Sequence, residues 1–487
     1  MPRLEWKPTR EIPLLHSACL FELGVCEVSH ARLSRVHFYC YLNFGDGVET
    51  MKQSLHKMSN AILIDLAVLF LLVGSFIIAP SYATLRMNTI STTAAHIRIL
   101  PAPDNETEGH YGQSIATGPG NIIVVGAGNE SANGYVGAGK VYTFHTNVGI
   151  LNYTFVSPNA QRYGDFGQSV AISAGGKRHY AYSSSVVVGA PNETVEGNMG
   201  AGHAYVFNTT TSALTNTLTS PNSQYDGEFG WSVTASGSIV VIGAPNETVN
   251  GIAGAGHAYV FDGVTGILLE TLTSPHPRAN GYFGLSVGMS DNNVENTTTV
   301  IVGAPGETSN GFAGSGRAYV FNTTTGKLTH TIDSPNAQSG GHFGFSVSLS
   351  VDLVAIGAPG ESSNGNSSAG NAYIFRTKGT LLFILSSPNS QLGGSFGSSV
   401  WISEQTVGVG APNETANGLA HAGNAYAFSD RTGSLIKLYD SPNSQTNGFF
   451  GYSITVVQGP EYPAYIVGVG APNENVSGYA ASGNAYV

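Results

Sequence analysis

A glutamate recurs seven times in this sequence, each time two residues after a triplet that reads Gly-Ala-Pro or Gly-Ala-Gly. Carboxylates gathered on one surface could attract cations or basic ligands. Alternatively, each carboxylate accepts backbone N–H bonds within its own glycine-rich loop, which would also place an identical residue in every copy. We favour this second interpretation. The seven residues are Glu130, Glu193, Glu247, Glu307, Glu361, Glu414 and Glu474.

Patterns that resemble catalytic motifs have a simpler explanation here. Residues 284–288 (Gly-Leu-Ser-Val-Gly) match a nucleophile elbow, which needs a strand-to-helix turn, but the same serine recurs in a predicted strand of every copy. His203 and His257 share a repeat position with Lys140, Arg317 and three asparagines, so we expect an exposed loop site rather than a metal ligand. With no HExxH, phosphate-loop or dinucleotide pattern, the sequence predicts a protein that is not an enzyme.

These residues belong to a unit that repeats from residue 97 onward at intervals of about 53 to 63 residues. Each unit has an aromatic-Gly pair, a triplet, an Ala-Tyr-Val-Phe-like run and a Leu-Thr-Ser-Pro-Asn-like run. We expect the small triplet residues to let neighbouring units approach closely. The pairs end at Gly112, Gly167, Gly230, Gly284, Gly344, Gly397 and Gly451, and the triplets begin at Gly126, Gly189, Gly243, Gly303, Gly357, Gly410 and Gly470.

Each unit contains four apolar runs of strand length between turn residues. In the third unit they are 232–234, 239–243, 258–261 and 268–272. Four strands per repeat are typical of a propeller blade. The last unit stops one strand short at 485–487, and residues 96–100 supply a matching strand. The sequence therefore predicts an all-β, seven-bladed propeller of four-stranded blades, closed by an N-terminal strand that completes the last blade. A truncated longer array with the same count is the alternative.

The aromatic-Gly and Gly-Ala-Pro pairs resemble the FG-GAP repeats of the integrin α-subunit propeller, over residues 96–487. The resemblance implies a seven-bladed propeller, an extracellular setting and a role in adhesion or ligand recognition. It also implies that the loops with the seven glutamates open on the ligand-binding face, which makes these glutamates ligand-face candidates.

The same resemblance implies calcium loops in the hairpins between each aromatic-Gly pair and its triplet. Calcium takes six to eight oxygen ligands, so several carboxylates and carbonyls must converge on one turn. Only the fourth hairpin keeps a remnant, in Asp291, Asn293 and Glu295. Asn296 replaces the turn glycine and Thr299 the last acidic ligand, so we expect weak affinity at most, with a solvated polar loop as the alternative. No cofactor other than calcium is expected.

Asparagine glycosylation sequons are dense, and they matter only in an exported protein. Asn-x-Thr also arises from ordinary turn chemistry. The candidates are Asn105, Asn129, Asn152, Asn192, Asn208, Asn246, Asn296, Asn322, Asn366, Asn413 and Asn475.

The only long apolar run is residues 61–79, which follows Lys52 and Lys57. It predicts a signal peptide over 51–83, cleaved after Ala83, with a membrane anchor as the alternative. Residues 1–50 hold all three cysteines and share no pattern with the repeats. We interpret them as upstream sequence translated by mistake or as a disordered extension, the alternative being a genuine cytoplasmic extension. Residues 84–95 are a linker, and 96–487 the propeller.

Composition agrees with many short strands joined by turns, since glycine numbers 63 and charged residues are only 10% of the chain. The net charge of −11 makes nucleic acid an improbable partner, because phosphate binding needs a basic face.

The sequence therefore predicts a non-enzymatic, secreted or cell-surface propeller for adhesion, ligand recognition or cell-envelope structure. Its expected partner is an extracellular protein or glycan, with a membrane as partner only if residues 61–79 remain as an anchor. The alternative is a propeller-fold enzyme or carbohydrate-binding protein with a site in the central channel. Buried carboxylates or histidines from different blades would favour this alternative, whereas near-identical blades argue against catalysis.

Overall fold

The computed structural model describes residues 37–44, 47–54, 97–118, 121–146, 148–173, 184–292, 297–403, 405–458 and 465–487, with the backbone alone for 37–44, 47–54, 291–292, 297, 457–458 and 465–466. The chain divides into two units, Met1–Thr92 and Thr93–Val487. In the first unit, β1 (His37–Phe44) and β2 (Gly47–Ser54) pair as an antiparallel hairpin. The predicted boundary at residue 51 falls within β2, while 61–79, Ala83 and 84–95 lie outside the described residues. No helix in the described part of the chain is long and apolar enough to cross a membrane.

The second unit consists of seven four-stranded antiparallel sheets, which confirms the predicted all-β propeller. Blade 1 comprises β4 (Ser114–Gly118), β5 (Ile122–Ala127), β6 (Lys140–His145) and β7 (Leu151–Val156). Blade 2 comprises β8 (Ser169–Ser173), β9 (Ser185–Ala190), β10 (His203–Asn208) and β11 (Leu214–Thr219). Blade 3 comprises β12 (Ser232–Ser236), β13 (Ile239–Ala244), β14 (His257–Asp262) and β15 (Leu268–Thr273). Blade 4 comprises β16 (Ser286–Asn292), β17 (Thr297–Ala304), β18 (Arg317–Asn322) and β19 (Lys327–Asp333).

The remaining blades repeat this order from the inner to the outer strand. Blade 5 comprises β20 (Ser346–Ser350), β21 (Leu353–Ala358), β22 (Asn371–Arg376) and β23 (Leu381–Ser386). Blade 6 comprises β24 (Ser399–Ser403), β25 (Thr406–Ala411), β26 (Asn424–Ser429) and β27 (Leu435–Asp440). Blade 7 comprises β28 (Ser453–Gln458), β29 (Tyr465–Ala471), β30 (Asn484–Tyr486) and β3 (Ile99–Leu100).

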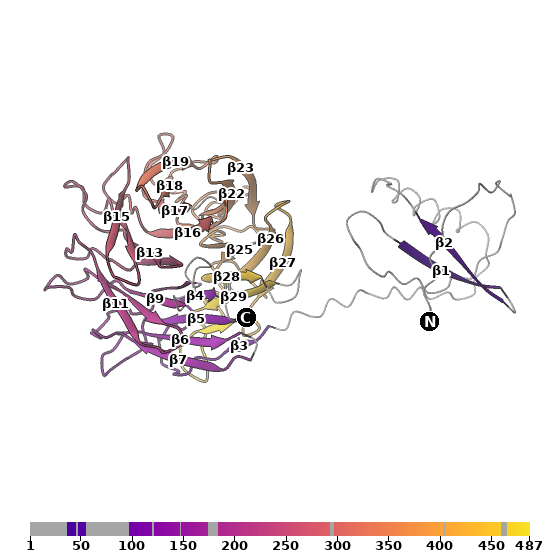
Figure 1. Cartoon of the computed structure of the whole chain (residues 1–487), viewed down its shortest axis with the longest axis horizontal. Coiled ribbons are helices and arrows are strands. Elements are labelled where there is room, and N and C mark those ends of the chain that lie inside the picture. Colours follow the sequence, from indigo (N-terminus) through magenta and orange to yellow (C-terminus); the bar gives the residue numbers. More distant parts are fainter. Residues whose placement is uncertain are drawn as a thin grey trace. The chain divides into compact units, whose positions relative to one another are not determined.

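The first strands of the seven blades form the inner wall of a closed ring. β4, β8, β12, β16, β20, β24 and β28 contact one another in this order, and β28 contacts β4. Figure 1 shows the outer strands β11, β15, β19, β23 and β27 at the rim of the ring.

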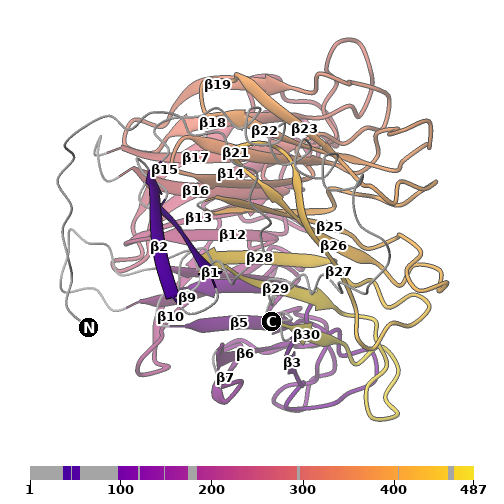
Figure 2. The ribbon, with the colours of Figure 1, turned by 90° about the vertical axis from the view of Figure 1, so that its right-hand side faces the viewer.

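The two ends of the repeat array meet in blade 7, as predicted. Ile99 and Leu100 of β3 pair with Tyr486 and Ala485 of β30. Arg98 and Val487 extend this pairing, since each backbone N–H donates to the other residue's carbonyl, at 2.7 and 2.9 Å. Figure 2 shows β28, β29, β30 and β3 following one another in this blade. The N-terminal strand thereby covers an edge that blade 7 would otherwise expose.

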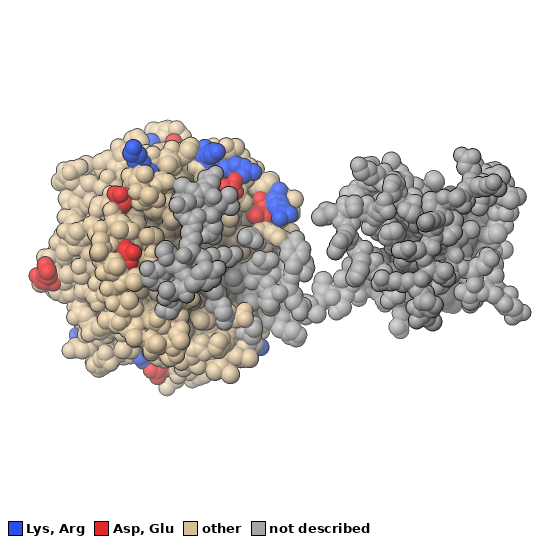
Figure 3. All heavy atoms as spheres, in the orientation of Figure 1, with Lys and Arg blue, Asp and Glu red and all other residues tan. Residues whose placement is uncertain are grey.

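The hydrophobic core consists of seven clusters, each shared by two consecutive blades. The aromatic residue of each aromatic-Gly pair lies in one of these clusters and is 0 to 1% exposed. In the fourth pair, the Phe283 ring meets the Phe321 ring edge-on, at 5.9 Å and 88°. Charged residues make up only 10% of the chain. Those visible in Figure 3 lie scattered over the face that it draws.

Neighbouring blades approach closely at the glycines of the two motifs, which confirms the reason expected for the small triplet residues. A Cβ on Gly243 of blade 3 would lie 1.9 Å from the carbonyl oxygen of Gly284, which opens blade 4. The same carbonyl accepts the Ser232 hydroxyl at 2.8 Å. Equivalent serine bonds join every consecutive pair of blades, including Ser453 of blade 7 to Gly112 of blade 1. All seven inner strands therefore begin side by side at one end of the ring.

Candidate functional site

The seven repeat glutamates, the ligand-face candidates of the sequence, have buried side chains that are 0 to 1% exposed. In blade 3, the Tyr259 hydroxyl donates to Glu247 Oε2 at 2.5 Å, and the Ser220 hydroxyl donates to Glu247 Oε1. Ser220 belongs to the Ser-Pro-Asn segment that leads from β11 into blade 3. We call this arrangement of glutamate, tyrosine and linker serine the clip, because it fastens a linker to the blade that follows it.

The clip recurs around the ring. A tyrosine twelve residues after the glutamate donates to it in every blade. A linker serine donates in blades 2, 3, 4, 5 and 7. The described donors are side-chain groups rather than the backbone N–H groups that the sequence suggested. Burial raises the pKa of Glu307, Glu361, Glu414 and Glu474, and the clip hydrogen bonds partly offset this rise.

The repeat position of His203 and His257 is buried, so the expectation of an exposed loop site is wrong. Each histidine begins the third strand of its blade and is 8% exposed. Its Nδ1 lies 2.8 Å (His203) or 2.7 Å (His257) from Oε2 of the clip glutamate. In blades 5, 6 and 7 an asparagine amide donates to the glutamate from the same place. The position varies because several side chains can face a carboxylate there.

Blade 1 has an altered clip. Strand register makes Ala102 the equivalent of the linker serine that the other blades have. Glu130 Oε1 is buried without a hydrogen-bond partner, while Tyr142 donates to Oε2. Lys140 lies 3.7 Å from Oε2 and also pairs with Asp104. Burial raises the pKa of Glu130 to about 8, although Tyr142 and Lys140 lower it in part.

The calcium remnant of blade 4 lies largely outside the described residues. Asp291 is in β16, where its backbone pairs with Thr298, and Asn293 and Glu295 fall in the segment that is not described. Thr299 pairs with Ser290 in β17. The described residues contain no group of three His, Cys, Asp or Glu side chains placed to hold a metal ion.

Three sequon asparagines, Asn129, Asn246 and Asn413, contact one particular repeat position, the residue just before the aromatic-Gly pair. The Asn129 amide lies 3.1 Å from His110 Nδ1, and the Asn413 amide donates to the Ser395 hydroxyl at 3.0 Å. Asn192 and Asn475 are exposed, Asn296 is not described, and Asn105, Asn152, Asn208, Asn246, Asn322 and Asn366 are half-buried.

The residue before each aromatic-Gly pair has a left-handed backbone, with φ between 54° and 59°. Its carbonyl accepts the N–H of the residue that follows the pair. Non-glycine residues adopt this conformation infrequently, and it costs roughly 1 kcal/mol or more. Because the turn imposes this backbone conformation in all seven blades, the identity of the side chain at this position can differ between blades. The seven residues are His110, Asp165, Glu228, Tyr282, His342, Ser395 and Phe449.

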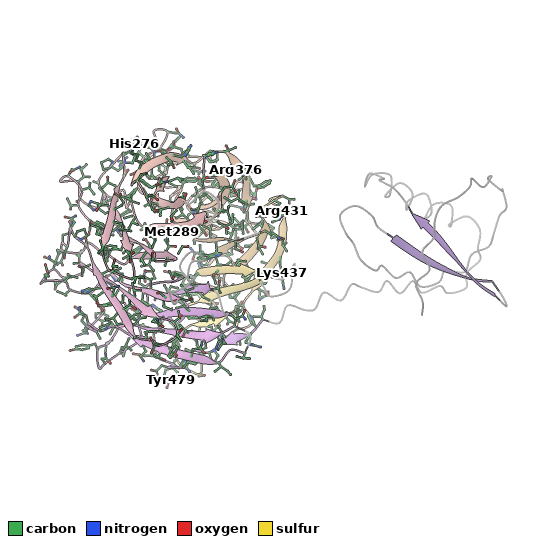
Figure 4. The ribbon with its side chains drawn as sticks, viewed as in Figure 1. His276, Met289, Arg376, Arg431, Lys437 and Tyr479 are labelled. Carbon is green, nitrogen blue, oxygen red and sulfur yellow. The ribbon has the colours of Figure 1, made fainter. Side chains whose placement is uncertain are left out.

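The residue after each pair is also variable and immediately precedes an inner strand. These residues gather at one end of the ring, because the inner strands begin side by side there. They are Gln113, Gln168, Trp231, Leu285, Phe345, Ser398 and Tyr452. We call the fourteen residues of the two positions the channel mouth. Figure 4 places Met289, from the inner strand β16, near the middle of the ring, with Tyr479 and Arg431 at its rim.

One side of the channel mouth is polar. The Gln113 amide donates to Gln168 Oε1 at 2.9 Å and to Asp165 Oδ1 at 3.4 Å. A Cβ on Gly128 would lie 2.0 Å from Asp165 Oδ1, so this glycine, which replaces the triplet proline of blade 1, makes room for the carboxylate. Burial raises the pKa of Asp165 to about 6, and the Gln113 hydrogen bond lowers it in part.

Glu228 from blade 3 joins this polar side. Burial raises the pKa of Glu228 to about 7, with repulsion from Asp226 and Asp165 adding to the rise and the Asn246 amide opposing it. The carboxyl groups of Asp165 and Glu228, which come from different blades, therefore repel each other at the mouth.

Other positions of the channel mouth carry large apolar and aromatic side chains, and one of these, Trp231, lies in blade 3 beside Glu228. Phe345 is 40% and Tyr452 48% exposed, whereas Trp231, Tyr282 and Phe449 are half-buried. Burial, and secondarily Asp165, raises the pKa of Tyr452 although half of this side chain is exposed.

Sequence reasoning missed the channel mouth because it searched for residues that stay constant between repeats. The signal was variation rather than constancy. The mouth residues differ from blade to blade although they flank the most constant pair of the repeat. The clip tyrosine also had a signal, the constant offset of twelve residues.

Seven four-stranded sheets that close into a ring through their two ends define a seven-bladed β-propeller. A family model described as FG-GAP repeat matches residues 214–261, 269–321 and 328–375. Each match runs from the outer strand of one blade to the third strand of the next, so each repeat spans two blades. Residues 214–375 therefore contain FG-GAP repeats, and these repeats lie in a seven-bladed propeller, as in integrin α N-terminal domains. No curated protein matches it.

Proposed function

We propose that this protein is a non-enzymatic, secreted or cell-surface propeller that recognises an extracellular protein or glycan through the channel mouth. One observation carries this proposal. The clips and the motif glycines repeat almost unchanged, whereas the fourteen mouth residues differ in chemistry from blade to blade. When equivalent positions of the seven blades carry different side chains, together they form one asymmetric surface that can bind a ligand.

The export part of the proposal rests on the predicted signal over 51–83 and on the sequons. It is tested by expressing the full-length chain with a C-terminal tag and assaying the intact cells and the medium. Tagged protein in the medium, or accessible to protease on intact cells, supports export. Tagged protein found only inside the cells contradicts it.

Recognition is tested by binding the labelled, purified protein to intact cells and extracellular matrix. We expect Trp231→Ala, in the channel mouth, to reduce binding at least tenfold. Leu438→Ala is the control, because Leu438 is 47% exposed but lies on the outer strand β27, outside the mouth. Equal binding by both variants would contradict recognition through the mouth.

One observation favours a second candidate, an enzyme acting on saccharides. Asp165 and Glu228 come from different blades, and burial raises both pKa values toward neutrality. Carboxyl groups with such pKa values can exchange protons near pH 7. Release of reducing sugar ends from oligosaccharides by the wild-type protein, and not by Glu228→Gln, would support this candidate.

A further inference from the structure

We propose that the channel mouth binds a neutral saccharide, through its amide and carboxyl groups and the faces of its aromatic side chains. This inference rests on the proposed recognition function and names the chemical class of its ligand.

The polar side of the mouth offers both donors and acceptors. A sugar hydroxyl needs a donor and an acceptor at nearly the same place, and an amide group supplies both. Gln113 and Gln168 already share one hydrogen bond of 2.9 Å, which fixes the orientation of both amides. Glu228 and the Asn246 amide extend this set toward blade 3.

The aromatic side chains of the mouth offer flat apolar surface. A pyranose ring has an apolar face of C–H groups, which can pack on an aromatic ring. Tyr452 immediately precedes β28 and Gln113 immediately precedes β4, and these two inner strands contact each other, so aromatic and polar positions of the mouth are neighbours. A ligand with hydroxyls at its edges and C–H groups on its faces matches this arrangement.

The charges of the mouth favour a neutral ligand. None of the fourteen residues is Lys or Arg, so an acidic sugar would find no counter-ion among them. Burial lowers the pKa of His110 and His342, which leaves both imidazoles neutral at pH 7. A permanent cation is favoured less than a polyol, because burial disfavours the charged forms of Asp165 and Glu228.

The test uses the full-length protein and an array of immobilised neutral hexose oligosaccharides. Sialylated oligosaccharides and arginine-containing peptides serve as comparison probes. We expect binding to at least one neutral oligosaccharide, and Gln113→Ala, Trp231→Ala and Tyr452→Ala should each weaken it at least tenfold. The partly exposed Tyr452 keeps the test decisive if Trp231→Ala fails to fold. Leu438→Ala, on the outer strand β27, should bind like the wild type.

Three outcomes would overturn the inference: no neutral saccharide bound, preferential binding of the arginine peptides, or saccharide binding unaffected by the mouth variants. If saccharides fail but Trp231→Ala still reduces binding to cells, the ligand class is wrong and recognition through the mouth stands. If bound oligosaccharide is hydrolysed, the ligand class stands and the non-enzymatic role is wrong.

Discussion

The buried carboxylate of each clip is stabilised by hydroxyl groups from two other segments. An unpaired polar group inside a protein loses its hydrogen bonds to water, so removing one partner costs more than removing both. In blade 3 the glutamate Glu247 is fully buried and accepts from both Tyr259 and Ser220. The clips should therefore contribute to stability only as complete sets.

We expect Glu247→Ala to lower the free energy of unfolding by about 2–4 kcal/mol, because it leaves two buried hydroxyls without their acceptor. Chemical denaturation measures this change. Glu270→Ala, on the half-exposed outer strand of the same blade, should change stability by less than about 1 kcal/mol.

A double-mutant cycle separates the clip from simple loss of volume. Adding Tyr259→Phe to Glu247→Ala should cost less than the same change in the wild type, because the tyrosine hydroxyl has already lost its partner. Strictly additive losses would show that the two residues do not act as a set.

The altered clip of blade 1 predicts a pH dependence. The Glu130 pKa is about 8 when folded and 4.5 ordinarily, so the folded state keeps a proton that the unfolded chain releases. Its contribution to stability is greatest below pH 4.5 and falls as pH rises to about 8, by at most about 1.4 kcal/mol per pH unit.

The variant Glu130→Gln cannot titrate, so its stability relative to the wild type should increase from pH 5 to pH 8. Denaturation midpoints of the two proteins, measured side by side across this range, test the expectation. A constant difference at every pH would show that Glu130 does not take up a proton on folding.

At the scale of strands and linkers, the blades are joined where glycine lets two backbones meet. Gly243→Ala should destabilise by about 3 kcal/mol or more, since its Cβ would meet the Gly284 carbonyl oxygen at 1.9 Å. Gly251→Ala should cost only about 1–2 kcal/mol, because φ is +82° but nothing lies within 4 Å. Thermal unfolding compares the two, and equal losses would show that the close contact between the blades at Gly243 adds no cost of its own.

Most of this level of structure could be predicted from the sequence. The four runs expected in the third repeat match β12, β13, β14 and β15 within two residues at each end. Period-two apolar runs and glycine turns are local signals, so a single repeat contains them. Sevenfold recurrence then excluded accidental matches.

The clips and the channel mouth depend on contacts that no local pattern encodes. Ser220 and Glu247 are 27 residues apart, and the serine belongs to the linker that precedes the blade. Asp165 reaches over Gly128 of the preceding blade. Such pairs become visible only when the blades are placed side by side, so the sequence could name the glutamates but not what surrounds them.

At the scale of the whole molecule, stability depends on the junction in blade 7. Leu100 is fully buried in the cluster shared by blades 7 and 1, whereas Ile99 beside it is 46% exposed. Leu100→Ala should therefore cost about 2–5 kcal/mol. Ile99→Ala should change stability by less than about 1 kcal/mol. Equal, small effects in denaturant titrations would indicate that the ring holds without this junction.

The composite seventh blade also means that the position of the chain break is arbitrary for the fold. In blade 3 the third and fourth strands are joined by the turn between Asp262 and Leu268, where blade 7 has its two separate ends. A circularly permuted gene that joins Val487 to Arg98 through a turn of this length, and starts instead at Thr265, should encode the same ring. Matching circular dichroism spectra and similar melting temperatures would show that all seven junctions are interchangeable.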